Sequence, residues 1–247
     1  VRPDLRGGEA VTVIERVKQF TSPYDGLKEE TGNHNRDVPF YPGYLWPDAI
    51  FDVKADEPYP VDSYRLLSGI VMEEGLKRSK RPLVLEFGCG PAHMIHYIYG
   101  RCDYIGIDGN PDFLRFNESL DQFKDKFLFL DLAKPIRLVN DYGSVKADII
   151  CCFEVLEHLY PKDVDVLLES VVTHMAPGAL FMCTASLKHR TTKDVHLTVE
   201  PREWWLEKFK AFGLTEVDGL AERIIDRHPW NWRAGSTNAF ALRSTVA

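Results

Sequence analysis

Short apolar runs alternate with amphipathic stretches along most of the chain. Seven runs have the length and the Val, Ile, Leu and Phe content of buried strands, and they cover residues 84–87, 104–108, 127–131, 147–153, 179–184, 214–217 and 238–243. Apolar residues at helical spacing between them predict helices over residues 93–100, 111–123, 161–175 and 201–212. This alternation favours an α/β fold with a mostly parallel, seven-stranded sheet covered by helices on both faces.

The N-terminal part of the chain follows a different pattern. Apolar residues on one face predict a helix over residues 62–78, and residues 9–20 predict a shorter amphipathic helix. Residues 24–60 are rich in Pro, Gly and aromatic residues without a helical period; they form either an irregular arm packed on the domain or a lid that shapes a pocket. We therefore expect an N-terminal aromatic-rich cap and first helix over residues 1–79, and a separate α/β domain over residues 80–247.

The first strand of the α/β domain breaks into closely spaced glycines. Gly88 and Gly90 follow the apolar run 84–87, just before a predicted helix. Because glycine has no Cβ, the backbone can take a positive φ and approach a ligand closely, and the start of a helix presents N–H groups to an anion. Many such loops are simple strand-to-helix turns, so the loop alone leaves both a structural and a cofactor-binding role open.

Acidic residues stand at the ends of the first four predicted strands. They are Glu86, Asp108, Asp131 and Glu154. Asp108 follows the glycine loop by about twenty residues, the place of a ribose-binding acid in a nucleotide-binding βαβ unit. Since the carboxyl ends of parallel strands meet at one edge of the sheet, we expect these four carboxylates to converge on one crevice.

These ordered motifs resemble those of class I S-adenosylmethionine-dependent methyltransferases over residues 80–245. The resemblance implies a Rossmann-like fold, S-adenosylmethionine as cofactor and S-adenosylhomocysteine as product. Where that family has a third glycine, this chain has Ala92 and His93, which changes the path of the loop. By the resemblance, Asp108 binds both ribose hydroxyls, and Asp131 and Leu132 meet the adenine. The complete implied cofactor site is Glu86, Phe87, Gly88, Cys89, Gly90, His93, Asp108, Gly109, Asp131, Leu132, Phe153 and Glu154.

A dinucleotide oxidoreductase shares the glycines and the later acid. Three features disfavour an oxidoreductase: the loop begins only after some 85 residues, the third glycine is missing, and there is no second βαβ half-domain.

Residues 154–158 place two carboxylates and an imidazole within five positions. If the segment starts a helix, Glu154 and Glu157 share a face and His158 lies one turn from Glu154. Together with His196 they are four candidate ligands for a divalent metal such as Mg. The segment is similar to that of metal-dependent ubiquinone-biosynthesis O-methyltransferases and of small-RNA 3′-terminal 2′-O-methyltransferases. The alternative stays open, because a Glu-His pair also occurs here in methyltransferases without metal, where it makes structural hydrogen bonds.

Transfer of a methyl group to a hydroxyl needs an acceptor held in line with the methyl and a route for its proton. His196 or His158 is the expected base, because imidazole titrates near neutral pH. By the resemblance, Glu154 faces the acceptor and is a further candidate catalytic residue. We therefore expect O-methylation of a small polar molecule such as a sugar, a phenol or a natural-product intermediate. Two alternatives remain: an RNA 3′-terminal 2′-O-methyltransferase, and a non-catalytic methyltransferase-like module of a larger enzyme.

Composition limits the partners and the compartment. The 247 residues carry a net charge of −7, which disfavours a broad nucleic-acid surface. The five cysteines include no C-x-x-C pair, which is typical of a reducing compartment, and no apolar stretch approaches the length of a membrane span, so we expect a cytoplasmic protein. The chain begins with Val1, as a fragment of a larger polypeptide would. The aromatic segment 228–235 covers the acceptor mouth or contacts a partner, including a second copy of the chain.

Overall fold

The computed structural model describes residues 16–19, 61–90, 92–109, 123, 125–140, 142–187, 196–227 and 237–245, and for 16–19 and 61–63 it describes the backbone alone. Three sequence predictions therefore lie outside the described residues: the aromatic arm, nearly all of the helix expected after Asp108, and the aromatic segment before the last strand.

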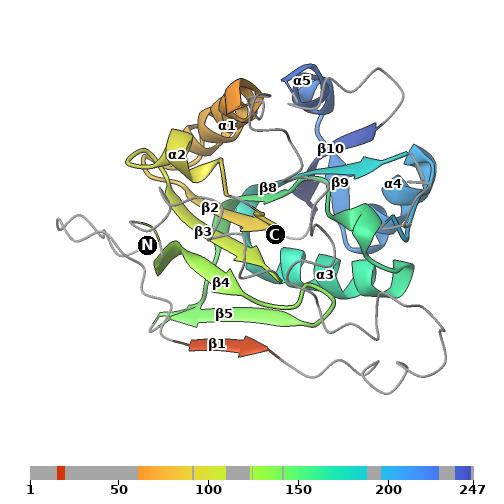
Figure 1. Ribbon diagram of the computed structural model, residues 1–247, viewed down its shortest axis with the longest axis horizontal. Coiled ribbons are helices and arrows are strands. Elements are labelled where there is room, and N and C mark those ends of the chain that lie inside the picture. Colours follow the sequence, from red (N-terminus) through yellow and green to blue (C-terminus); the bar gives the residue numbers. More distant parts are fainter. Residues whose placement is uncertain are drawn as a thin grey trace, which may run out of the picture.

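A seven-stranded sheet forms the centre of the molecule (Figure 1), in the order β4-β3-β2-β7-β8-β10-β9. The first five strands in that order pair in parallel, and β10 pairs antiparallel with both β8 and β9. This confirms the predicted α/β class and the mostly parallel sheet. In chain order the strands are β2 (Leu83–Phe87), β3 (Asp103–Asp108), β4 (Phe127–Phe129), β7 (Ala147–Cys152), β8 (Met175–Ser186), β9 (Leu214–Glu216) and β10 (Thr237–Ser244).

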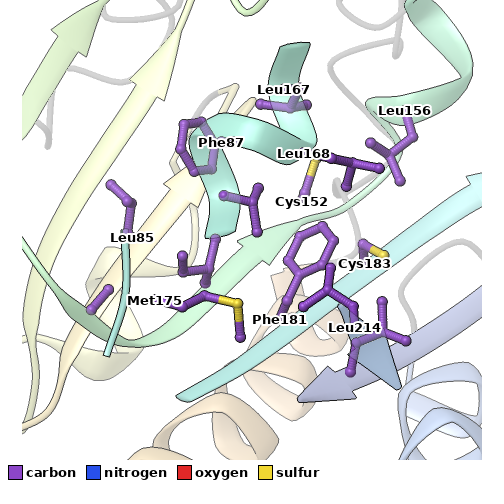
Figure 2. Close-up of a cluster of buried hydrophobic side chains, with 14 of the residues drawn as sticks. Leu85, Phe87, Cys152, Leu156, Leu167, Leu168, Met175, Phe181, Cys183 and Leu214 are labelled. Atoms are coloured by element: carbon purple, nitrogen blue, oxygen red, sulfur yellow. The ribbon is translucent and has the colours of Figure 1, made fainter. Parts of the chain in front are cut away.

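Helices cover both faces of this sheet (Figure 1). One face carries α1 (Val61–Leu76), α2 (Ile95–Ile98) and α5 (Leu220–Arg227), and the other carries α3 (Pro161–His174) and α4 (Arg202–Ala211). Because both faces are covered, neighbouring strand residues are buried on opposite sides: Val84 packs under α1, while Leu85 packs in the core on the α3 side. The α3-side core, centred on Phe87, Phe181 and Cys183, is drawn in Figure 2.

A second, three-stranded sheet was not expected. It contains β1 (Arg16–Gln19), β5 (Ile136–Asn140) and β6 (Gly143–Ser144), all antiparallel. The prediction of a helix over 9–20 is therefore wrong at residues 16–19, because the backbone there pairs with the edge of β5 instead of with itself. The signal for β5 was present in the sequence, since Ile136 and Leu138 are buried around exposed Arg137 with the period of a strand.

Three further boundaries differ from the predictions. Helix α2 is four residues long instead of eight, and α5 was not predicted at all. Strand β8 begins at Met175 and runs through Pro177 and Gly178, which were expected to form a turn before the strand. Gly178 has a φ of +72°, so the expected left-handed residue is present, but within a longer strand.

Candidate active site

The glycine loop leaves β2 with a left-handed backbone. Gly88 has a φ of +72° and Gly90 of +49°. The N–H groups of Gly88 and Cys89 both donate to the Ile107 carbonyl, at 2.7 and 3.1 Å, which holds the loop against the end of β3. A Cβ on Gly88 would overlap the Val155 side chain, so this position needs glycine for its conformation and for its lack of volume.

The loop continues as turns and not as a long helix. Ala92, at the position of the missing third glycine, also has a positive φ of +50°. Its N–H donates to the Cys89 carbonyl at 2.8 Å, and regular helix begins only at Ile95. The helix predicted over 93–100 is therefore much shorter than expected, because α2 is a single turn.

His93 lies half-buried beside this turn. Its ring centroid is 5.0 Å from that of Tyr64 on α1. Burial lowers the pKa of His93 to about 4, and the charge of His96 acts in the same direction. The His93 imidazole is therefore neutral at physiological pH.

Asp108 connects the glycine loop to the end of β3. The Gly90 N–H donates to Asp108 Oδ2 at 2.9 Å, and the Leu130 N–H donates to the Asp108 carbonyl at 3.0 Å. Asp108 and the following Gly109 are both half-buried. A carboxylate has about four acceptor positions, so Asp108 can hold the loop and still accept a hydroxyl.

Asp131 shapes its own turn after β4. Its Oδ1 accepts the Ala133 N–H at 2.9 Å, and the Lys134 ammonium lies 3.9 Å from Oδ2. The next residue, Leu132, is only 3% exposed and packs in the core with Phe87. The side chain of Phe87 is itself fully buried, so any contact of Phe87 with a cofactor falls to its backbone.

Glu86 is buried at the carboxyl end of β2. It is 5% exposed, and the Tyr104 hydroxyl donates to its carboxyl group. Burial raises the pKa of Glu86 to about 8; the hydrogen bond from Tyr104 opposes this shift, and the charge of Asp108 adds to it. Glu86 is therefore largely protonated at neutral pH.

The chain kinks at the end of β7. Glu154 has a φ of +55°, and its N–H donates to the hydroxyl of buried Thr184 on β8 at 2.9 Å. The preceding Phe153 is half-buried against the α1-side core. No helix starts at Glu154; a single 3₁₀ turn, η4 (Leu156–His158), follows instead. Glu154 and Glu157 therefore do not share a helix face.

Three of the four candidate metal ligands lie together. Each contributes one side-chain ligand atom, and these three atoms lie within 4.8 Å of one another; the residues are Glu157, His158 and His196. The two imidazole centroids are 4.8 Å apart and the rings are nearly perpendicular, at 89°. Glu157 is fully buried and His196 is 7% exposed, while His158 is half-buried. Among the described residues, this group does not include Glu154.

Glu157 connects the three segments that form this cluster. Its Oε1 accepts the N–H of Ser186, the last residue of β8, at 3.0 Å. Its backbone carbonyl accepts the N–H groups of Leu197 and Thr198 at 2.6 and 3.0 Å, and the Thr198 hydroxyl donates to the Leu159 carbonyl at 2.6 Å. Sequence reasoning missed Thr184, Ser186 and Thr198. Thr184 and Ser186 carry the signal that revealed Glu154, a polar residue at the end of an apolar strand.

The described helices include none that is long and apolar enough to cross a membrane.

Comparison with known proteins agrees with this geometry. Residues 85–181 match a family model described as a methyltransferase domain. No curated protein sequence matches the chain. The structure is similar to DhpI in its complex with SAH (S-adenosylhomocysteine): TM-score 0.58, 17% identity, covering 85% of this chain and 97% of that chain.

Two further structures show how much this fold accommodates. N-methyltransferase NodS from Bradyrhizobium japonicum WM9, in complex with S-adenosyl-L-homocysteine, has a TM-score of 0.51 at 16% identity and covers 81% of this chain and 98% of its own. The [4+2]-cyclase SpnF has a TM-score of 0.52 at 15% identity and covers 74% of this chain and 81% of its own. At these identities the likeness identifies the fold alone. The methyltransferase domain model matches residues 85–181, which are less than half of the chain.

Proposed function

We propose that the protein transfers the methyl group of S-adenosylmethionine to a hydroxyl of a small polar molecule, such as a sugar, a phenol or a natural-product intermediate. The observation that carries this proposal is the Glu157, His158 and His196 cluster, which lies at the same edge of the sheet as the glycine loop. Val155 connects the two regions, because it fills the space beside Gly88 and lies two residues before Glu157.

The side chains divide the work between cofactor and acceptor. Gly88 and Gly90 leave room for close approach of the cofactor, and Asp108 offers oxygen acceptors to ribose hydroxyls. S-adenosylmethionine, when bound, supplies a methyl carbon that its sulfonium already activates. His158 or His196 accepts the hydroxyl proton as the oxygen–methyl bond forms and the sulfur–methyl bond breaks. The rings lie at 89°, so the two imidazoles present nitrogen atoms in different directions.

The same cluster has the donor set of a divalent-metal site. Two imidazoles and one carboxylate suit transition-metal ions better than Mg, which prefers oxygen ligands. Ligand atoms about 2.1 Å from a tetrahedral metal lie roughly 3.4 Å apart, so atoms as far apart as the 4.8 Å limit of this group would have to move closer together to bind one ion. Glu157, His158 and His196 would hold the ion, which would lower the pKa of an acceptor hydroxyl.

The test is turnover with defined acceptors. Purified protein and S-adenosylmethionine are incubated in separate reactions with small hydroxylated compounds, with matched amines, or with short RNA oligonucleotides. The S-adenosylhomocysteine formed in each reaction is quantified. Transfer to hydroxyl compounds supports the proposal. Transfer to amines alone contradicts O-methylation. Transfer to RNA 3′ ends alone supports the alternative that the position of His196 also suggests, an RNA 3′-terminal methyltransferase.

The metal is tested in the same assay. Protein dialysed against EDTA is assayed before and after addition of Mg²⁺, Mn²⁺ or Zn²⁺. Restored turnover that is lost in a Glu157→Gln variant supports a metal at the cluster, whereas full activity in EDTA shows that the imidazoles act without metal.

A further inference from the structure

His196 lies on a segment without regular secondary structure. Residues 196–200 form neither helix nor strand before they lead into α4, yet the His196 side chain is only 7% exposed. Its ring lies beside that of His158, with the centroids 4.8 Å apart. Since no helix or strand fixes His196, its position depends on the individual hydrogen bonds that hold this segment.

These bonds attach the segment to the turn that carries the other two members of the cluster. The Leu197 and Thr198 N–H groups donate to the Glu157 carbonyl, at 2.6 and 3.0 Å. The Thr198 hydroxyl donates at 2.6 Å to the carbonyl of Leu159, the residue at which η4 ends. Thr198 therefore bonds to η4 through both its backbone and its side chain, and the side-chain bond is the one that a substitution can remove.

The Thr198 hydroxyl is well placed to fix the imidazole. Thr198 is 2% exposed and Leu159 is 5% exposed, so water has little access to either partner if the bond is lost. His196 lies two residues before Thr198, a span of at most about 7 Å, so a movement of Thr198 moves the imidazole with it. At the other end of the segment, buried Trp205 donates its Nε1–H to the Glu200 carbonyl at 3.2 Å, which anchors the segment to α4.

We propose that Thr198 is a positioning residue for methyl transfer, because its hydroxyl, bonded to the end of η4, holds the His196 imidazole where it receives the acceptor's proton. That proton passes to an imidazole nitrogen as the oxygen–methyl bond forms and the sulfur–methyl bond of S-adenosylmethionine breaks. This inference rests on the proposed function. Thr198 acts only through His196, and a displacement of about 1 Å at a reacting group can cost about 10²-fold in rate.

Thr198→Val removes the hydroxyl and keeps the shape of the side chain. It should lower kcat about 10- to 100-fold on the acceptor that the wild type methylates, with little change in the affinity for S-adenosylhomocysteine. Thr198→Ser keeps the hydroxyl and should stay close to the wild-type kcat. Ser170→Ala is the matched control, since the Ser170 hydroxyl on α3 is also buried and donates to a backbone carbonyl, that of Val166, at 3.0 Å. It should lose stability and keep kcat.

The same substitution in a His196→Ala protein tests whether Thr198 acts through the imidazole. If it does, Thr198→Val should lower kcat by no more than about twofold in that background. A purely structural role of Thr198 would instead lower kcat by the same factor in both backgrounds.

Chemical labelling gives a readout that does not need turnover. Diethyl pyrocarbonate acylates accessible imidazoles, and mass spectrometry identifies each modified histidine. Because release of the segment should expose its imidazole, His196 should react several-fold faster in Thr198→Val than in the wild type or in Thr198→Ser. His96 is exposed on α2 and should react at the same rate in all three proteins.

The outcomes separate this inference from the proposed function. Equal losses of kcat in both backgrounds, an unchanged kcat in His196→Ala, or a folded Thr198→Val with wild-type kcat and labelling overturn the inference. If Thr198→Val does not fold, Thr198→Ala takes its place in both measurements. Wild-type protein that binds S-adenosylmethionine but methylates none of the acceptors removes the proposed function, and the labelling of His196 then decides alone whether Thr198 holds the imidazole.

Discussion

The proposed cofactor side and the proposed acceptor side of the site are built in different ways. On the cofactor side, the glycine loop is held by contacts within one strand-loop-strand unit, such as the bond from Gly90 to Asp108, 18 residues apart. On the acceptor side, Glu157 bonds to Ser186 across 29 residues, and Thr198 bonds to Leu159 across 39. The cofactor side thus depends on local backbone geometry, while the acceptor side depends on side chains that the fold brings together from three segments.

Removal of the buried histidine should have the largest effect, and on one side only. His196→Ala should lower kcat by about 10²- to 10⁴-fold, the usual contribution of a positioned general base or acid. The affinity for S-adenosylhomocysteine should stay within about twofold, because the glycine loop is held by hydrogen bonds to the Ile107 carbonyl and to Asp108. Steady-state kinetics and calorimetry measure the two quantities.

His96→Ala is the control for this change, since His96 is an exposed histidine near the glycine loop. An His196→Ala enzyme with unchanged kcat would show that the cluster is structural. Equal losses of turnover and cofactor affinity would show that the two sides are not independent.

Substitution of the first loop glycine should have the converse effect. Gly88→Ala introduces a Cβ at a φ of +72° and against Val155. Backbone strain of about 1–2 kcal/mol and overpacking of about 1–3 kcal/mol should together weaken S-adenosylhomocysteine roughly 10- to 1,000-fold by displacing the loop. Direct binding titration measures the change.

Gly178→Ala is a matched control for the strain alone, because Gly178 has the same φ of +72° and open space at its Cβ position. We expect a small loss of stability and unchanged cofactor affinity for it. Val155→Ala in the Gly88→Ala background should restore part of the affinity. If Gly88→Ala binds like the wild type, the loop does not contact the cofactor.

The difference between the two sides also explains how far the sequence could predict the structure. Strand periodicity and the spacing of Gly88, Gly90 and Asp108 revealed the strands and the loop, because each of these signals lies within a short stretch of sequence. The kink at Glu154 could not be predicted, since a positive φ in a non-glycine residue depends on the Thr184 hydroxyl from another strand. The contact of Tyr104 with Glu86 depends on strand register, which no periodicity encodes.

Acid should reveal the buried, neutral state of His93 beside the glycine loop. Burial lowers the pKa of His93 to about 4, so between pH 6.5 and 4 the unfolded chain binds a proton that the folded protein does not. The stability associated with neutral His93 is therefore present above pH 6.5 and is lost as the pH falls toward 4. His93→Asn should reduce the fall in unfolding free energy between pH 7 and pH 4.5 by roughly 2 kcal/mol.

Urea unfolding of both proteins at the two pH values measures this difference, and NMR titration of the His93 ring gives an independent check. Burial also lowers the pKa of His174, whose Nε2 accepts the Leu138 N–H at 2.9 Å. Some acid sensitivity should therefore persist in His93→Asn. A His93 ring that titrates near pH 6.5 would contradict the buried, neutral state.

The smallest expected effect concerns the hydroxyl that holds the kink between the two sides. Thr184→Val keeps the shape of the side chain but removes the acceptor for the Glu154 N–H, which should cost about 0.5–1.5 kcal/mol of unfolding free energy. Glu154 lies between the end of β7 and Val155, which packs at Gly88. A relaxed kink should therefore change the alignment of cofactor and acceptor. We expect kcat to fall a few-fold, with little change in KM. Thr184→Ser retains the hydroxyl and should keep near wild-type kcat at a similar loss of stability. A Thr184→Val enzyme whose kcat matches that of Thr184→Ser would show that the Glu154 kink is maintained by packing, and that the two sides are aligned without this hydrogen bond.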